Sequence, residues 1–257
     1  MKHWLGWLGF VGALVGGMGA VEAKPKVVLL HVAAAGFADI QSKLLATGMF
    51  DAVDQIDLQT TVPTVTDLAP YDSALLWGAV FTSPKDATTT GNNLATWIDQ
   101  GHGVVQAVFS SYSGYEIKGT YTAYYLQQPA SSYVSSATGL GTISEVGSPL
   151  LSGVSTFTCG TLCYRQKLTL INGAIKVAEY LDATPLVVRG RINGRSRVDV
   201  NSSPPSSTVS TGGWNAATDG ARIFANALVY VTDGGNPVSA NLSDVGIAET
   251  GLPPLAT

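Results

Sequence analysis

Two serines, Ser110 and Ser111, directly follow the apolar run at 103–109, which predicts a buried strand. A serine on the turn after a strand can be a nucleophile, but only when a neighbouring base takes its proton. The strained turn that exposes such a side chain needs flanking glycines, and the first glycine here is Gly114. The sequence therefore predicts that both serines shape the edge of a pocket and do not act as nucleophiles.

The histidines determine whether a base is present. His3 lies in the basic start of a predicted signal peptide and would be removed with it. His102 precedes the strand at 103–109, a strand's length from the serines. His31 lies near the carboxyl end of another predicted strand, at the right end of the sheet. A dyad of His31 with Ser110 is one interpretation, but a histidine within an apolar strand is more often a buried structural residue.

A metal site is the other chemistry open to His31, with Asp39 or Asp72 as a further ligand. The sequence has neither the His-x-His nor the His-Glu-x-x-His spacing that is typical of metal sites. We therefore predict no metal and no cofactor.

The two cysteines, Cys159 and Cys163, lie four residues apart with Gly160 between them. In an exported protein this pair favours a disulfide, which would close a small ring and contribute about 2 kcal/mol of stability. Free thiols and a metal site are the alternatives, although the sequence has no second cysteine pair to complete a metal site.

Aromatic and small polar side chains are candidates for binding. Trp77 ends a predicted strand, and the segment at 112–125 is rich in tyrosine: Tyr112, Tyr115, Tyr121, Tyr124 and Tyr125. Such rings can stack on a sugar or bind a protein, and they can equally pack the segment onto the sheet. The loop at 201–207 could offer hydroxyl groups to a ligand or be a rigid Pro-Pro turn. The candidate ligand-binding residues are His31, Trp77, Ser110, Ser111, Tyr112, Asn201 and Ser202.

The first half of the chain alternates strands and helices. Strands are predicted for the apolar runs at 26–32, 50–58, 73–79 and 103–109. Helices are predicted at 36–48 and 91–101, the second capped by Asn92 or Asn93. Residues 60–72 are predicted to be a loop. This order is typical of a parallel sheet with helices on both faces.

The second half is predicted to be rich in β-structure. Residues 112–140 predict loops or a hairpin insertion. Short strands follow at 166–173, 174–181, 184–194 and 195–202. Asn193-Gly194 predicts a hairpin turn between the last two strands. A final helix buries a face made of Ile223, Phe224, Ala227, Leu228 and Val231. The tail at 233–257 is predicted to be loosely ordered.

Composition and the amino terminus narrow the class of protein. Charged residues form 12% of the 257 residues, about half the usual ~25%, and the net charge is −4 without a Lys/Arg run. Nucleic acid is therefore not an expected partner. Residues 1–23 have the basic start, apolar core and small-residue cleavage site of a secretory signal peptide, with an uncleaved anchor helix as the alternative. The mature chain has no further apolar span and is expected to be secreted or periplasmic.

Several segments together resemble the class I glutamine amidotransferase-like superfamily, and within it the ThuA-like exported domains. These segments are 44–78, 94–109, 149–157, 173–188, 197–207 and 214–231. The resemblance implies a flavodoxin-like sheet with any ligand site at the carboxyl ends of its strands. Active members place a cysteine after the fourth strand and a histidine later in the chain. Here Ser110 or Ser111 takes that place and no histidine follows His102, so the resemblance implies a domain without the catalytic triad.

The sequence thus predicts one exported α/β domain at 24–232, with a flavodoxin-like, mostly parallel sheet, helices on both faces and a β-rich insertion in the second half. Its expected role is non-catalytic. It would bind a carbohydrate or protein partner at the carboxyl edge of the sheet, or serve as a structural module of an envelope or extracellular assembly. A ThuA-like hydrolase or sugar-modifying enzyme with an unassigned site is the alternative. The oligomeric state stays open.

Overall fold

A computed structural model describes residues 23–32, 36–207 and 212–232. Within them, nine strands form one mixed sheet in the order β2-β1-β3-β4-β11-β10-β9-β6-β7. The first five in this order are parallel to one another: β2 (Ala52–Asp57), β1 (Lys26–His31), β3 (Ser73–Trp77), β4 (Gly103–Ala107) and β11 (Arg195–Val200). The rest pair antiparallel: β10 (Pro185–Ile192), β9 (Ile175–Tyr180), β6 (Thr138–Ile143) and β7 (Thr158–Cys159). The predicted α/β fold with a parallel core is confirmed.

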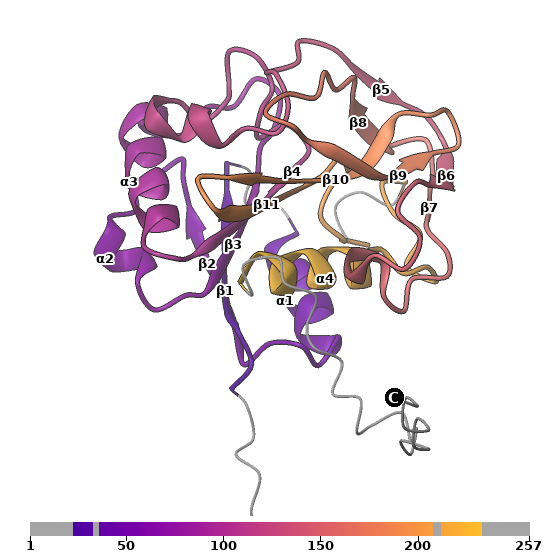
Figure 1. The fold of residues 1–257 in the computed structure, drawn as a ribbon, viewed down its shortest axis with the longest axis horizontal. Coiled ribbons are helices and arrows are strands. Elements are labelled where there is room, and N and C mark those ends of the chain that lie inside the picture. The colour runs from indigo at the N-terminus through magenta and orange to yellow at the C-terminus, as the bar shows by residue number, and fades with distance from the viewer. Residues whose placement is uncertain (1–22, 33–35, 208–211, 233–257) are drawn as a thin grey trace, which may run out of the picture.

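Helices cover both faces of the parallel core (Figure 1). α1 (Phe37–Ala46) and α4 (Gly220–Thr232) pack on one face, with the short 3-10 helix η2 (Pro149–Leu151) against α4. α3 (Ala87–Asp99) and the 3-10 helix η1 (Gly119–Tyr124) pack on the other face. Alternate residues of β1 therefore enter different cores, and nearly all are buried, which explains why the sequence of this strand is apolar without alternation.

The third helix begins a turn earlier than the sequence pattern predicts. Asp86 caps α3, because its carboxylate accepts hydrogen bonds from the main-chain N–H groups of Thr88 and Thr89 at 3.0 and 2.9 Å. The prediction that Asn92 or Asn93 is the cap was therefore wrong. Both lie inside the helix and bind neighbouring segments, Asn92 at Thr120 and Asn93 at Pro63.

The predicted loop at 60–72 contains a short helix, α2 (Val65–Leu68), that lies against α3. It starts with a capping box, in which Thr64 and Asp67 each bind the other's main-chain N–H group. This reciprocal pair explains why one helical turn forms where the apolar periodicity is absent.

The hairpin and the last helix follow the prediction. β10 and β11 are joined by Asn193 and Gly194, whose φ angles of 50° and 75° give the left-handed pair that a tight hairpin turn requires. All five predicted core positions of α4 are buried: Ile223, Phe224, Ala227, Leu228 and Val231.

The β-rich segment divides between two sheets. Its longer strands extend the large sheet, whereas β5 (Tyr133–Ser135) and β8 (Tyr164–Gln166) form a small antiparallel sheet of their own toward the top of Figure 1. The predicted strand at 166–173 was wrong. The chain leaves β8 at Gln166, and beyond it only Leu170 makes an isolated bridge, to Gln127.

The signal segment up to Glu22 and the carboxyl-terminal tail at 233–257 lie outside the described residues, so their predictions stay predictions. Among the residues that the structure describes, no helix is both long and apolar enough to cross a membrane.

Candidate functional site

The parallel strands of the large sheet end at a common edge, and the candidate residues gather there. His31 ends β1 in register with Trp77, the last residue of β3. Val200 ends β11 in register with Ala107, the last residue of β4. The segments that hold the other candidates follow directly, at 108–112 and 201–202. The prediction that these segments meet at the carboxyl edge agrees with the structure.

The turn after β4 has an unusual main-chain conformation at Phe109, whose φ of 67° lies in the left-handed region. A bulky residue adopts this region only when the surrounding structure holds it there. Gly78 lets the turn approach β3, because a Cβ atom at that position would lie 2.4 Å from the Phe109 carbonyl oxygen. This strained position was not predicted, because the sequence of the turn has no glycine that would mark it. Its side chain is a phenyl ring and carries no nucleophilic atom.

The two serines of this turn have their hydroxyl groups engaged within the protein. Ser110 donates its hydroxyl hydrogen to the Ala107 carbonyl oxygen at 2.6 Å, and the residue is 3% exposed. The Ser111 hydroxyl oxygen accepts a hydrogen bond from the Gln127 amide at 2.8 Å and is fully buried. The Ser110 hydrogen is thus directed at a carbonyl group, whereas an activated serine would direct it at a base.

His31 is a buried ring in an aromatic stack. Its centroid lies 4.2 Å from that of Phe37 and 5.4 Å from that of Trp77. Asp72 precedes β3, at the opposite end of the sheet, and its carboxylate accepts a hydrogen bond from the Lys26 main chain. Among the described residues, no group of three His, Cys, Asp or Glu side chains could hold a metal ion.

The remaining candidate acid and base are Asp39 and His102. Asp39 lies in the first turn of α1, where its carboxylate forms an ion pair with Lys43 and accepts a hydrogen bond from the Ser207 main chain. Burial would raise the pKa of Asp39, but these contacts lower it below its usual value. His102 stacks on Trp97 at the amino end of β4, where burial lowers its pKa. Both groups are engaged in stabilising contacts.

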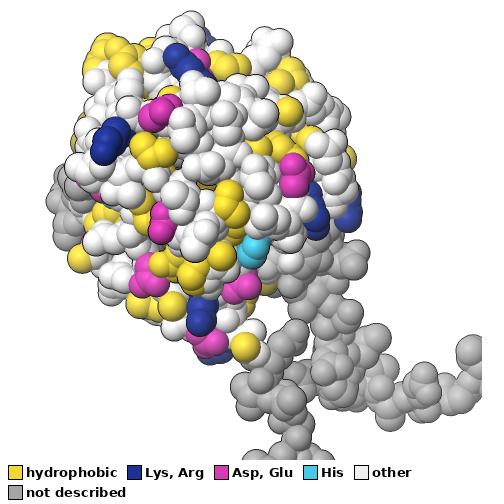
Figure 2. Space-filling view, turned by 90° about the vertical axis from the view of Figure 1, so that its left-hand side faces the viewer, with side chains coloured by type: hydrophobic (Ala, Val, Ile, Leu, Met, Phe, Trp, Pro, Cys, Tyr) yellow, Lys and Arg dark blue, Asp and Glu magenta, His cyan; other side chains and the backbone are white. Residues whose placement is uncertain are grey.

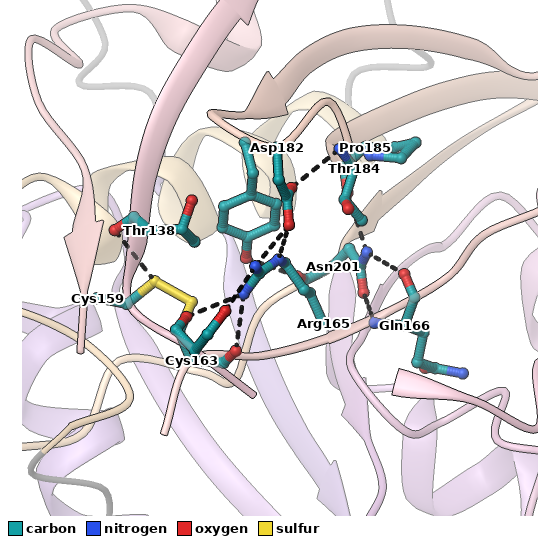
Figure 3. Close-up of polar contacts among 11 residues, drawn as sticks. Thr138, Cys159, Cys163, Arg165, Gln166, Asp182, Thr184, Pro185 and Asn201 are labelled. Atoms are coloured by element: carbon teal, nitrogen blue, oxygen red, sulfur yellow. Dashed lines mark hydrogen bonds and ion pairs between the residues drawn. A yellow bond between two sulfur atoms is a disulfide. The ribbon is translucent and has the colours of Figure 1, made fainter. Parts of the chain in front are cut away.

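Hydrogen bonds connect the small sheet to the carboxyl edge. The Phe109 main-chain N–H donates to the side-chain oxygen of Gln166 at 2.8 Å. The Asn201 side chain in turn binds both main-chain groups of Gln166, at 2.8 and 2.9 Å, and donates to the Pro185 carbonyl oxygen. The Asn201 side chain thus pairs with the main chain of β8 as the main chain of a neighbouring strand would. It joins β8 to the end of β11 (Figure 3). The Ser202 carbonyl oxygen accepts a hydrogen bond from the Val108 main-chain N–H at 3.2 Å.

A buried arginine and the disulfide hold the other end of β8 (Figure 3). Cys159 and Cys163 are bonded to each other, with their Cα atoms 5.3 Å apart, which confirms the predicted pairing. Arg165 is 2% exposed and donates to Asp182 at 2.9 Å and to the Cys163 carbonyl oxygen at 3.2 Å. Burial would raise the pKa of Asp182, but the hydrogen bonds from Arg165 and Thr184 lower it.

Six aromatic rings form a continuous strip across the carboxyl edge and the small sheet. They come from the segments after β3 and β4 and from β5 and β8: Phe81, Phe109, Tyr112, Tyr115, Tyr133 and Tyr164. Neighbouring centroids lie 5.3–6.3 Å apart. Phe109 is the buried centre, whereas Phe81 is 79% and Tyr133 is 39% exposed. We call this set the aromatic strip.

Only Tyr112 of the strip was among the candidate ligand-binding residues. Phe81, Tyr133 and Tyr164 were missed because each lies in a different segment with no pattern of its own. The remaining predicted tyrosines, Tyr121, Tyr124 and Tyr125, are buried and pack η1 onto the sheet. For these three, the packing alternative holds.

A second group of buried polar side chains lies under η1. Arg197 is fully buried and donates to the Val104 and Tyr124 carbonyl oxygens and to the Tyr121 hydroxyl. Burial raises the pKa of Tyr121 to about 12. Asp199, two residues further along β11, is 2% exposed, and neither of its carboxylate oxygens has a hydrogen-bond partner among the described residues. Burial raises the pKa of Asp199 to about 7, although Arg197 opposes the shift.

A cleft of about 540 Å³ lies beside the disulfide and away from the two serines. Its lining includes Thr158, Cys159, Ser207, Trp214 and Asn215. Trp214 is 7% exposed, so most of its indole is packed against the protein and little of the ring faces the cleft. None of the candidate ligand-binding residues lines it.

Charges do not gather on the face of the molecule that Figure 2 shows, where basic and acidic side chains lie scattered among hydrophobic ones. This distribution gives no continuous field of one sign on that face. Polyelectrolyte binding would need such a field.

No family model matches the sequence, and no curated protein matches it. Solved structures with the same arrangement do exist. The crystal structure of a protein described as ThuA-like, from Parabacteroides merdae, is 14% identical and covers 82% of this chain and 91% of its own, with a TM-score of 0.58. A protein described as part of a GMP synthase, from Thermoplasma acidophilum, is 10% identical and covers 82% of this chain and 96% of its own, with a TM-score of 0.50.

These likenesses show the fold and nothing finer. The chain has an α/β fold of the kind seen in ThuA-like and glutamine amidotransferase-like proteins, which confirms that part of the sequence resemblance. At these identities, the activity of either neighbour does not transfer to this chain.

Proposed function

We propose that this protein is an exported, non-catalytic binding module that holds a carbohydrate or protein partner at the carboxyl edge of its sheet, as part of an envelope or extracellular assembly. The observation that carries the proposal is the aromatic strip. Its two most exposed members, Phe81 after β3 and Tyr133 in β5, are joined through the intervening rings. Large rigid rings provide contact area at little conformational entropy cost, which favours binding.

The turn after β4 supports a non-catalytic role. In the superfamily that the sequence resembles, active members carry their nucleophile after the fourth strand. Here Phe109 occupies the strained position, and Gln166 binds its N–H group. The hydroxyls of Ser110 and Ser111 are buried and engaged in hydrogen bonds. The residues at this edge therefore position the strip and do not form a nucleophile with its base.

The disulfide supports export. Cys159 and Cys163 are bonded in the structure, and such bonds persist in oxidising compartments. Together with the signal-like residues 1–23, this favours a secreted or periplasmic location. Amino-terminal sequencing of the exported protein should give Lys24 as the first residue, and a secreted chain that still begins at Met1 would contradict cleavage.

A binding screen with matched variants tests the proposal. The purified mature chain is screened against soluble polysaccharides and against proteins of the same envelope, beside two double variants. Phe81→Ala with Tyr133→Ala removes the exposed rings of the strip. Val146→Ala with Leu181→Ala removes side chains that are also exposed, 89% and 73%, but lie outside the strip. Binding that only the first variant loses supports the proposal, and binding that survives in that variant contradicts it.

The alternative is a ThuA-like hydrolase or sugar-modifying enzyme with a site elsewhere, and the cleft beside Trp214 is the specific feature that favours it. Its volume lies within the range of small-molecule sites. Turnover of an ester, amide or glycoside by the purified chain, lost on Asn215→Ala but not on the strip variant, would establish the enzyme instead.

A further inference from the structure

We propose that the partner of the aromatic strip is a single chain of a neutral polysaccharide. This inference rests on the proposed function and identifies its ligand. It follows from the charge of the segments around the strip, from their hydroxyl groups, and from the angles between the rings.

The segments that carry the strip contain no ionisable side chain other than the phenols of their tyrosines and the bonded Cys163. They are 79–83, 109–115, 128–136 and 161–164, and none contains Asp, Glu, Lys, Arg or His. Charged residues begin just outside these segments. Lys167 is exposed, and its main-chain N–H donates to the Ser132 carbonyl oxygen at 3.3 Å. Arg165, next to Tyr164, is 2% exposed and bound to Asp182. Glu116, next to Tyr115, has one carboxylate oxygen buried. The segments that carry the rings therefore offer no charge of their own to an acidic or basic polymer, which favours a neutral ligand.

Hydroxyl and amide groups border the rings. Ser113, Ser131, Ser132 and Ser135 are exposed in the same segments, as is Gln128. A sugar presents apolar C–H faces and hydroxyl groups side by side, so it can pack on a ring and exchange hydrogen bonds with such neighbours. A protein partner would be expected to meet a rim with charges and arginine, which these segments lack.

The rings form a path and not a plane. From Phe81 to Tyr115, to Tyr112 and to Tyr133, the centroids are 5.9, 6.3 and 6.1 Å apart, and the interplanar angles are 78°, 31° and 62°. A monosaccharide covers about one such step, so a ligand that reaches both exposed ends must span several sugars. A flat crystalline surface cannot meet rings that are turned by these angles. A single flexible chain can follow them.

The exposed end of the path is held in a strained conformation. Phe81 lies at the tip of a tight turn that Ala79 and Thr82 close with an isolated bridge, and its φ is 66°. The turn thus keeps a large apolar ring 79% exposed at an unfavourable main-chain angle. An exposed ring held at a strained main-chain angle favours a binding role for Phe81.

The test measures the affinity of the full mature chain for neutral, acidic and basic polysaccharides. The neutral probes are a soluble mixed-linkage glucan, a galactomannan and methylcellulose; polygalacturonate is the acidic probe and chitosan the basic one. Titration calorimetry is run at low salt and at high salt. We expect at least one neutral polymer to bind, with Kd changing less than about twofold between the two salt concentrations, because no ion pairs form. A hexasaccharide of that polymer should bind more tightly than its disaccharide, by about tenfold or more, because it reaches more rings.

The variants distinguish failure of the neutral-polysaccharide inference from failure of the proposed binding function. Phe81→Ala with Tyr133→Ala should weaken binding of the neutral polymer by about fivefold or more, and Val146→Ala with Leu181→Ala should leave it unchanged. Binding confined to the acidic or basic probe, or to a protein, but still dependent on the strip, would overturn the neutral-polysaccharide inference and leave the proposed function standing. Binding of any probe that the strip variant retains in full would overturn both, as would the absence of binding to every probe and every envelope protein.

Discussion

Replacing Asp199 by asparagine should make the protein more stable at neutral and alkaline pH. The side chain is 2% exposed, and its carboxylate oxygens have no hydrogen-bond partner among the described residues. The buried charges and phenols around it are Arg197, Tyr121 and Tyr125, and Arg197 is already satisfied by three other acceptors. Ionisation of Asp199 in the fold is therefore unfavourable, and asparagine of the same shape cannot ionise.

The magnitude follows from the shift in pKa. Burial raises the pKa of Asp199 from 3.8 to about 7, so the folded state binds one proton more than the unfolded state between these values. The free energy of unfolding then falls by about 1.4 kcal/mol per pH unit as pH rises, in total about 4 kcal/mol, and this contribution is constant above the folded-state pKa. The asparagine amide lacks acceptors in the same place, which costs about 1–3 kcal/mol at every pH. At alkaline pH the variant should therefore exceed the wild type by about 1–3 kcal/mol.

Urea unfolding at about pH 5 and about pH 8, followed by tryptophan fluorescence with the disulfide intact, measures this effect. Other carboxylates contribute equally to both proteins, so the difference between variant and wild type isolates Asp199. That difference should move by about 3 kcal/mol in favour of the variant between the two pH values. Asp54→Asn, at an exposed position of the edge strand β2 where Asp54 accepts a hydrogen bond from Tyr71, is the exposed-carboxylate control. A constant difference, or a variant that loses stability as pH rises, would mean that the carboxylate is ionised and paired with Arg197, and would refute the reasoning.

Three further predictions follow from the carboxyl edge. Asn201→Ala should lower the free energy of unfolding by about 3 kcal/mol, because it leaves buried main-chain groups of β8 and β10 unpaired, and urea unfolding that changes by less than about 1 kcal/mol would contradict this. Gly78→Ala should cost about 1–3 kcal/mol in the same assay, since its Cβ would lie 2.4 Å from the Phe109 carbonyl oxygen; an unchanged midpoint would show that the turn yields freely. A fluorophosphonate should label neither Ser110 nor Ser111, and an adduct on either serine in peptide mass spectra would show an activated nucleophile.

The order of elements was predictable because local signals carry it. The central strands β1, β3 and β4 are buried on both faces and therefore read as mainly apolar runs, as at Lys26–His31. The turn at Asn193-Gly194 requires left-handed backbone angles that these two residues adopt readily. The buried face of the last helix follows from its helical spacing. The start of α3 was misplaced, because the Asp86 cap lies before the apolar periodicity begins.

The candidate site was predictable only in its place. Parallel strands end at one edge, so His31, Trp77, Ser110 and Asn201 could be assigned to it from their positions at or after the ends of strands. Packing between distant segments decides which side chains are exposed at this edge. The serine hydroxyls turned inward, and the exposed rings belong to segments that the sequence marks only as loops.

The sequence by itself determined the alternation of strands and helices and the low charge, and it favoured the disulfide between Cys159 and Cys163, since each depends on residues close in the chain or on composition. The tertiary structure decided the rest. The strained Phe109 is held by Gln166, 57 residues away, and Gln166 by Asn201, 35 residues further on. The aromatic strip joins rings from separate parts of the chain in the same way. Contacts between such distant residues leave no periodic pattern in the sequence, because they exist only once the sheet has brought the segments together.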